Sequence, residues 1–166
     1  LNSILISSKN VDDFEFEVCV SDNFSEKNPI QIVEKYKKEF NIVFNRNTKN
    51  LGFAQNAIET LKLSKGKYIL WVNSDDILAD SSSLEKLSNY LNQTEMEWVT
   101  GRVSFIFENQ EKIFNFIPYV YPNFFIKNGL AHDCFWGFVQ QESTVFSREL
   151  YTRVGGFNKN LKMAGD

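Results

Sequence analysis

The sequence predicts an α/β fold in which a mostly parallel sheet is flanked by helices and carries a small antiparallel addition. Short apolar runs alternate with segments whose apolar residues recur at helical spacing, and this order repeats three times in residues 16–91. Residues 103–116 then show apolar residues at alternate positions, the pattern of an antiparallel pair. The repeated strand–helix order implies parallel strands joined by right-handed crossovers.

Each predicted strand is a short apolar run bounded by polar residues. Strands buried on both faces of a sheet have such continuous apolar runs. The runs lie at residues 16–21, 41–44, 67–72 and 144–146, and the antiparallel pair at 103–107 and 113–116.

The predicted helices follow from apolar residues spaced three or four apart. The first has its apolar positions at Ile30, Val33, Tyr36 and Phe40. A second runs from about residue 53 to 64, with Phe53, Ala57 and Leu61 on one face and Gly66 after its end. A third begins with a capping box at Ser82 and Glu85 and buries Leu84, Leu87 and Leu91. A short helix follows at 148–154.

Bulk composition excludes several classes of protein. The chain has 166 residues, of which 43% are hydrophobic and 23% charged, which is ordinary for a globular domain. A net charge of -3 argues against a nucleic-acid-binding protein, which would need a basic face. No apolar stretch is long enough to span a membrane, and the visible start has no signal peptide. Two cysteines, Cys19 and Cys134, make no disulfide framework, so a reduced, cytoplasmic setting is expected.

The most informative feature is the strand at 67–72, which runs directly into Asn73-Ser74-Asp75-Asp76. Ligands of open α/β sheets bind beyond the carboxyl ends of the strands. Acidic residues there can hold a hard divalent cation, which in turn holds phosphates. The alternative is a solvated turn whose aspartates cap the next helix.

Three stretches of sequence together form a longer pattern. They are FEVCVSDNFS at 16–25, NLGFAQN at 50–56 followed by the strand into NSDD at 73–76, and QQESTVFSRELY at 140–151 continuing through VGGF at 154–157 to Asp166. In this order and spacing they resemble the family 2 glycosyltransferases, which adopt the nucleotide-sugar-binding GT-A fold. The resemblance covers nearly the whole chain and is strongest at 50–77 and 140–166.

The resemblance implies a donor site. Asp22, after the first strand, would contact the nucleotide base. Asn50 and Gly52 begin the family's glycine-started helix, where backbone N–H groups favour anions. Asn56 is similar to a variant found in some bacterial surface-polysaccharide transferases, the abequosyltransferase-like proteins among them.

The resemblance also implies a metal and a base. The family's acidic motif is usually Asp, any residue, then Asp, and Asn73 occupies its first position here. Asp75, with Asp76, would hold Mg²⁺ or Mn²⁺, while Asn73 would bind ribose or a metal-bound water. Asp166 matches the catalytic base, although Gly165 precedes it where the family often has Glu.

The implied activity is metal-dependent, inverting transfer of a sugar from a nucleotide-sugar donor to a hydroxyl of a glycan or lipid-linked acceptor. Residues 1–166 are expected to form one partial catalytic domain, with a nucleotide-binding half at about 1–95 and an acceptor-side half at about 96–166. Residues 1–8 resemble the end of the family's first helix, so the first strand and the C-terminal part are expected to be missing, and the fragment to bind nucleotide weakly. The full-length protein is expected in the cytoplasm, either free or peripheral at the inner face of the membrane.

Other interpretations stay open. A non-catalytic nucleotide-sugar or glycan-binding module on the same fold is the alternative from another class. His132, near Trp136, could line an acceptor site, although a single histidine in an aromatic stretch is more often structural. A phosphoacceptor receiver domain would need an acid pair after its first strand and a late lysine, and neither is evident.

Overall fold

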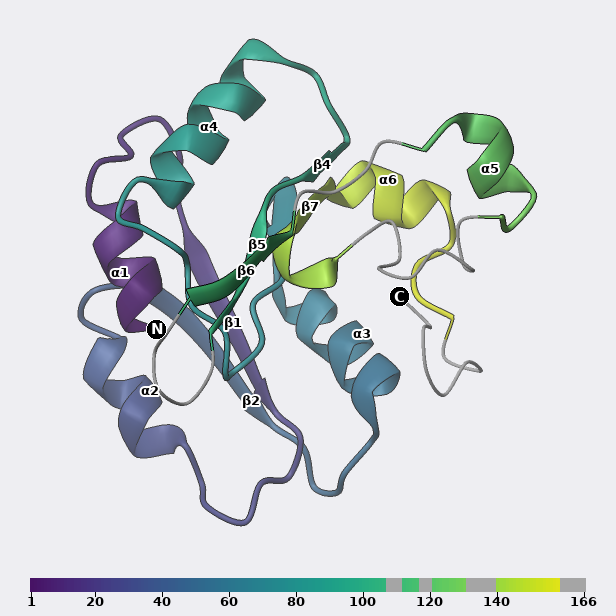
Figure 1. Ribbon diagram of the computed structural model, residues 1–166. Helices are drawn as coiled ribbons and strands as arrows, with labels where there is room; N and C mark the ends of the chain where they lie inside the picture. The colour runs from purple at the N-terminus through teal and green to yellow at the C-terminus, as the bar shows by residue number, and fades with distance from the viewer. Residues whose placement is uncertain (107–111, 117–120, 131–139, 159–166) are drawn as a thin grey trace.

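The computed structural model describes residues 1–106, 112–116, 121–130 and 140–158 (Figure 1). The first two strands, β1 (Glu17–Asp22) and β2 (Asn41–Arg46), pair in parallel, with Glu17 opposite Asn41 and Asp22 opposite Arg46. Helix α2 (Ile30–Tyr36) connects them and buries Val33. The parallel pair expected from the sequence is therefore confirmed, and each strand extends to a polar residue at its carboxyl end.

A three-stranded antiparallel sheet lies beside this pair (Figure 1). Its central strand is β7 (Thr144–Ser147), which pairs antiparallel with β3 (Tyr68–Leu70) on one side and β4 (Trp98–Thr100) on the other. The strands β3 and β4 therefore run parallel to each other. All four residues of β7 are buried, as expected for a central strand.

Helices cover both sides of the β1–β2 pair. Helix α3 (Phe53–Leu63) contacts β1, α2 contacts β2, and Figure 1 shows the two helices on opposite sides of the pair. Helix α1 (Asn2–Ser8) packs against α4 (Ser83–Gln93). Helix α6 (Arg148–Arg153) follows β7 directly and begins with a cap, because Ser147 Oγ accepts a hydrogen bond from Leu150 N.

The remaining elements are short. Strands β5 (Val103–Ile106) and β6 (Lys112–Phe116) form the expected antiparallel pair, with an irregularity between Phe105 and Ile106. A five-residue helix, α5, spans Asn123–Lys127, and a 3₁₀ turn at Gln141–Ser143 leads into β7.

The core joins α3 to the three-stranded antiparallel sheet. Leu61, Ile69 and Phe146 are buried together. The Phe146 ring stacks on Tyr151, at a centroid distance of 6.0 Å, and on Trp98 at 6.2 Å. Because these residues come from five separate elements, the hydrophobic contact fixes the position of the β3 carboxyl end relative to α3.

Two expectations about the helices are corrected, one about the cap of α4 and one about the buried face of α3. The Ser82 side chain does not cap α4, because its hydroxyl bonds Asp80 Oδ1 at 2.7 Å. A residue of α1 takes this place. The fully buried Ser7 Oγ accepts a hydrogen bond from Leu84 N, in the first turn of α4, at 3.0 Å. Phe53 was expected on the buried face of α3. It is the first residue of that helix, and it is 48% exposed.

Candidate functional site

The carboxyl end of β1 places a buried acid against a cation. The Asp22 side chain is 3% exposed, and its Oδ2 lies 3.0 Å from Nε of Arg46, the residue opposite it on β2. Its Oδ1 accepts a hydrogen bond from Ser25 N at 3.1 Å. The contact of Oδ2 with Arg46 is an ion pair without hydrogen-bond alignment. Little of this carboxylate is left open to a ligand, and its predicted contact with a nucleotide base stays a prediction.

The Arg46 guanidinium is held on three sides. Besides the ion pair, Nη2 donates to Ser25 O at 2.7 Å, and the guanidinium carbon lies 6.0 Å from the centroid of the Phe24 ring. Phe24 has a φ of +68°, in the left-handed region, and is 54% exposed. A bulky side chain is rarely found in that region, so the loop after β1 is conformationally strained at this residue.

Asparagines tie this loop to the start of α3. Asn23 Nδ2 donates to Asn50 Oδ1 at 3.0 Å and to Gly52 O at 3.3 Å. Its Oδ1 accepts from Leu51 N at 2.9 Å and from Asn47 Nδ2 at 3.2 Å. One side chain thus uses both ends of its amide to hold the segment that precedes α3.

The same network continues under the first turn of α3. Asn56 Oδ1 accepts from Ser21 Oγ at 2.9 Å and from Asn47 Nδ2 at 2.8 Å. Asn45 Nδ2 donates to Asn47 Oδ1 at 2.9 Å and to Ser21 Oγ at 3.3 Å. The structure therefore brings the predicted residues Asn50 and Asn56 into one network with Asp22's neighbours. Three further members of this network were not predicted from the sequence, although asparagines are concentrated at two strand ends: Asn23, Asn45 and Asn47.

Gly52 is needed for its backbone conformation. Its φ is +79°, and a β-carbon added there would meet no atom within 4 Å. Space is therefore not the constraint; the left-handed φ is. Asn50 Oδ1 accepts from Gly52 N at 2.9 Å, which fixes this turn immediately before α3.

The acidic segment after β3 is a turn with two differently placed carboxylates. Asn73 Oδ1 accepts from Trp71 Nε1 at 2.9 Å, and Asp76 N donates to Asn73 O at 3.2 Å. Asp75 is exposed. Asp76 is half-buried, and its Oδ2 is shielded from solvent without a hydrogen-bond partner. The Trp71 ring meets Phe53 edge-on at 6.1 Å, which links this segment to the start of α3.

These donors fit a hard divalent cation. One or two carboxylates, completed by phosphate and water oxygens, are the protein ligands that Mg²⁺ usually takes. The unpaired Asp76 Oδ2 is an oxygen for which the described residues supply no partner. Within that part of the chain no cluster of three or more His, Cys, Asp or Glu side chains is found, so a cation here would depend on ligands from a bound phosphate or water.

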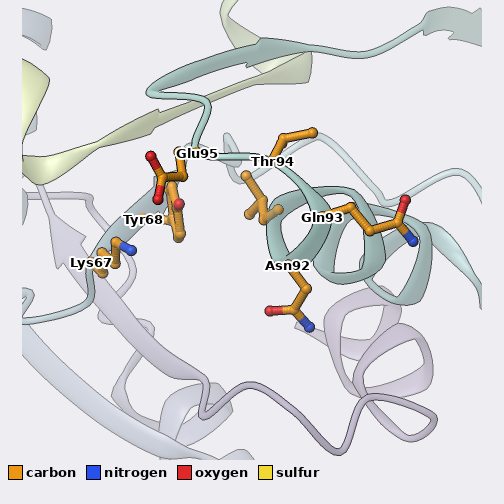
Figure 2. Close-up of a pocket in the computed structure, with 7 residues that line it drawn as sticks. Lys67, Tyr68, Asn92, Gln93, Thr94 and Glu95 are labelled. Atoms are coloured by element: carbon orange, nitrogen blue, oxygen red, sulfur yellow. The ribbon is translucent and has the colours of Figure 1, made fainter.

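A separate hollow lies at the opposite end of β3. Its volume is about 450 Å³. Figure 2 shows the residues that line it, between the start of β3 and the end of α4. It is lined by Lys67, Tyr68, Leu91, Asn92, Gln93, Thr94 and Glu95. The acidic segment follows the other end of the strand, so this cavity is not part of the candidate site.

Several predicted residues lie outside the described ranges. Asp166 and Gly165 belong to residues 159–166, and His132, Cys134 and Trp136 to residues 131–139. Their expected roles stay predictions. In the parts of the chain that the structure describes, no helix is both long and apolar enough to cross a bilayer.

Comparison with known proteins defines the family. The model of glycosyl transferase family 2 matches residues 1–154, and the chain belongs to this family. It is 34% identical over 95 residues to abequosyltransferase RfbV of Salmonella typhimurium, covering 55% of this chain and 28% of that protein. It is 32% identical over 118 residues to the uncharacterised glycosyltransferase MJ1057 of Methanocaldococcus jannaschii, covering 70% of this chain and 40% of that protein.

A solved structure shares the fold. The structure of residues 1–349 of Staphylococcus aureus TarS with UDP superposes on 99% of this chain and 46% of its own, with a TM-score of 0.66 and 21% identity. The expected GT-A architecture is confirmed by this likeness. The chain spans less than half the length of each of these three proteins.

Proposed function

We propose that the protein transfers a sugar from a nucleotide-sugar donor to a hydroxyl of a glycan or lipid-linked acceptor, with inversion at the anomeric carbon. The observation that carries the proposal is the family match over residues 1–154, which includes both the strand-end acid Asp22 and the acidic segment 73–76. TarS, which shares the fold, has been solved with UDP, and this supports a nucleotide-linked donor.

The donor is assigned to the carboxyl ends of β1 and β3. Asp22 serves the base, Asn73 the ribose, and Gly52 and its neighbours Asn50 and Asn56 shape the turn that precedes α3. The hydrogen bonds of the asparagine network support this assignment, because they fix the backbone of that turn before any ligand arrives.

The acidic segment is assigned to the metal. Asp75 and Asp76 would hold Mg²⁺ or Mn²⁺ together with the donor diphosphate. When bound, such an ion neutralises negative charge on the departing nucleoside diphosphate. Asp75 is exposed and therefore accessible to a ligand, whereas Asp76 has one carboxylate oxygen for which no described residue supplies a hydrogen-bond partner.

Asp166 is proposed as the base. The acceptor oxygen would attack the anomeric carbon while the bond from that carbon to the diphosphate oxygen breaks, and the hydroxyl proton would pass to the Asp166 carboxylate. A carboxylate within hydrogen-bond reach of the hydroxyl is suited to this step. The assignment rests on the family resemblance of residues 140–166.

The acceptor and compartment are proposed from the same resemblance. The Asn56 variant and the relationship to an abequosyltransferase support a bacterial surface polysaccharide as the product class. A lipid-linked acceptor would bring the full-length protein to the cytoplasmic face of a membrane.

Calorimetric titration of a set of nucleotide sugars tests the donor site. The titrations use the full-length protein with and without Mn²⁺, as wild type, Asp75→Ala and Asp12→Ala. Asp12 is an exposed aspartate that precedes β1, at the end of the strands away from the site. Metal-dependent binding that is lost in Asp75→Ala and kept in Asp12→Ala is the expected result. Binding that ignores both the metal and Asp75 would contradict the metal assignment.

A non-catalytic binding module is the second candidate, because Asn73 replaces the acid usual at the first position of the motif. Asp166→Asn separates the two. If the protein is an enzyme, this variant keeps donor binding and loses transfer. Donor binding with no transfer by the wild type to any tested glycan or lipid-linked acceptor would favour the module, and unchanged transfer by Asp166→Asn would remove this base from the mechanism.

A further inference from the structure

We propose that the Phe24 ring, backed by the Arg46 guanidinium, is the surface on which the base of the nucleotide donor stacks. This inference deepens the proposed function and rests on it, because it names the groups that would hold the nucleoside end of the donor. Phe24 would then meet the face of the base, while the buried Asp22 holds the guanidinium behind the ring.

The first observation is that Phe24 has an unfavourable backbone conformation and an exposed ring. Its φ of +68° is unfavourable for a residue with a β-carbon, and bulky side chains such as phenylalanine are rarely found there. Its side chain is 54% exposed, so the ring contributes little to the core. Strained residues of this kind cluster at ligand-binding positions, where the conformation serves to present the side chain.

The second observation is that the Arg46 guanidinium is held in place against one face of this ring. Asp22 Oδ2 and Ser25 O hold its Nε and Nη2, and the guanidinium lies over the Phe24 ring at 6.0 Å. An aromatic ring paired with a fixed guanidinium plane is a common stacking surface for bases. Because these contacts are already made within the protein, little ordering is left to occur when a base arrives.

The third observation is the position of the pair. Asn23, the residue between Asp22 and Phe24, bonds both Asn50 and the Gly52 carbonyl before α3. Phe24 therefore follows directly after the residue that bonds the turn before α3, and we assign this turn to the donor. A base stacked on Phe24 would leave its sugar and phosphates close to residues already proposed for them.

The test compares nucleotides with pyrophosphate. UDP, GDP, CDP and ADP, and pyrophosphate as the probe without a base, are titrated with Mg²⁺ into the full-length wild type, Phe24→Gly, Phe24→Tyr and Tyr90→Ala. Tyr90 is an aromatic residue of α4 that is 45% exposed and lies outside the site, and it serves as the control. Thermal denaturation is measured for each variant.

The expected result separates stacking from folding. For the tightest nucleotide, Phe24→Gly should raise Kd by roughly 5- to 150-fold, the range for losing one base–aromatic stack. Pyrophosphate binding should not change, and Tm should stay the same or rise because glycine relieves the left-handed φ. Phe24→Tyr should keep the wild-type affinity, and so should Tyr90→Ala.

The contrary outcomes are distinct. If Phe24→Gly binds nucleotides with the same affinity as the wild type, Phe24 is not the stacking surface, and the proposed function is unaffected. Equal weakening of nucleotide and pyrophosphate, or a lower Tm, would assign Phe24 a structural role instead. Failure of all four nucleotides to bind the wild type would overturn the proposed function and this inference with it.

Discussion

Removing the Arg46 side chain should destabilise the fold strongly, because it leaves a buried charge without a partner. Asp22 has a side chain that is only 3% exposed, and Arg46 is the cation beside it. Breaking a fully buried ion pair costs about 3–5 kcal/mol. The Arg46 side chain is 29% exposed, so water offsets part of this cost. We expect Arg46→Ala to lower the free energy of unfolding by about 2–3 kcal/mol, or Tm by roughly 4–12 °C for a chain of this size.

Urea and thermal denaturation followed by circular dichroism measure this loss. Arg153→Ala is the matched control, because Arg153 also pairs with a carboxylate, that of Glu97, but both side chains are largely exposed. Surface ion pairs contribute little, so the control should change stability far less. The double variant Asp22→Asn/Arg46→Ala should be more stable than Arg46→Ala alone, because it removes the stranded charge.

Either of two results would refute the explanation that Arg46→Ala strands a buried charge. If Arg46→Ala and Arg153→Ala lose the same free energy of unfolding, burial of Asp22 does not decide the cost. If adding Asp22→Asn recovers nothing, the loss comes from the contacts of Arg46 with the loop backbone and not from an uncompensated carboxylate.

Three further predictions concern the helices and β1. Ser7→Ala should lower the free energy of unfolding by about 1–3 kcal/mol in urea, because a buried N–H of α4 loses its acceptor; wild-type stability would show that another acceptor is available. Hydrogen bonds from the Ser82 hydroxyl and backbone N–H lower the pKa of Asp80 from 3.8 to about 2, so its contribution to stability is complete above about pH 4 and is lost as the pH falls through 2. Ser82→Ala should raise this pKa toward 3.8 in an NMR titration, and an unchanged value would refute the assignment of cause. Burial raises the pKa of the Cys19 thiol above its ordinary 9.0, so in a Cys134→Ser variant alkylation should be slow at pH 8 and its rate should still be rising at pH 9; a rate that has levelled off by pH 8 would contradict it.

Local periodicity was sufficient to predict most elements. The apolar runs and helical spacing located β1, β2, α3 and α4 to within a few residues, because each buries a continuous stripe or face. Local periodicity does not show which strands pair, so the position of β7 between β3 and β4 could not be predicted from it. Register between strands more than 40 residues apart depends on side chains that meet only in the folded chain, such as Phe146 with Trp98.

The candidate site was predicted in its residue types and less well in its contacts. Asp22, Asn50 and Asn56 were identified from a family resemblance, but the hydrogen bonds that occupy them could not be. Amide side chains pair with whichever donors the tertiary fold brings near, so sequence alone does not reveal their partners. The same limitation explains the capping box, where Asp80 captures the Ser82 hydroxyl that was expected to bond the helix.

The central position of β7 has a consequence for recombining members of this family. A cut near residue 95 would place β3 in one parent, and β7 and β4 in the other, although the three strands form one sheet. Ile69 of the first parent must then pack against whichever side chain replaces Phe146 in the second. Exchange of the segment after residue 95 between relatives should therefore succeed only when the residues facing each other across β3, β7 and β4 are exchanged as a set.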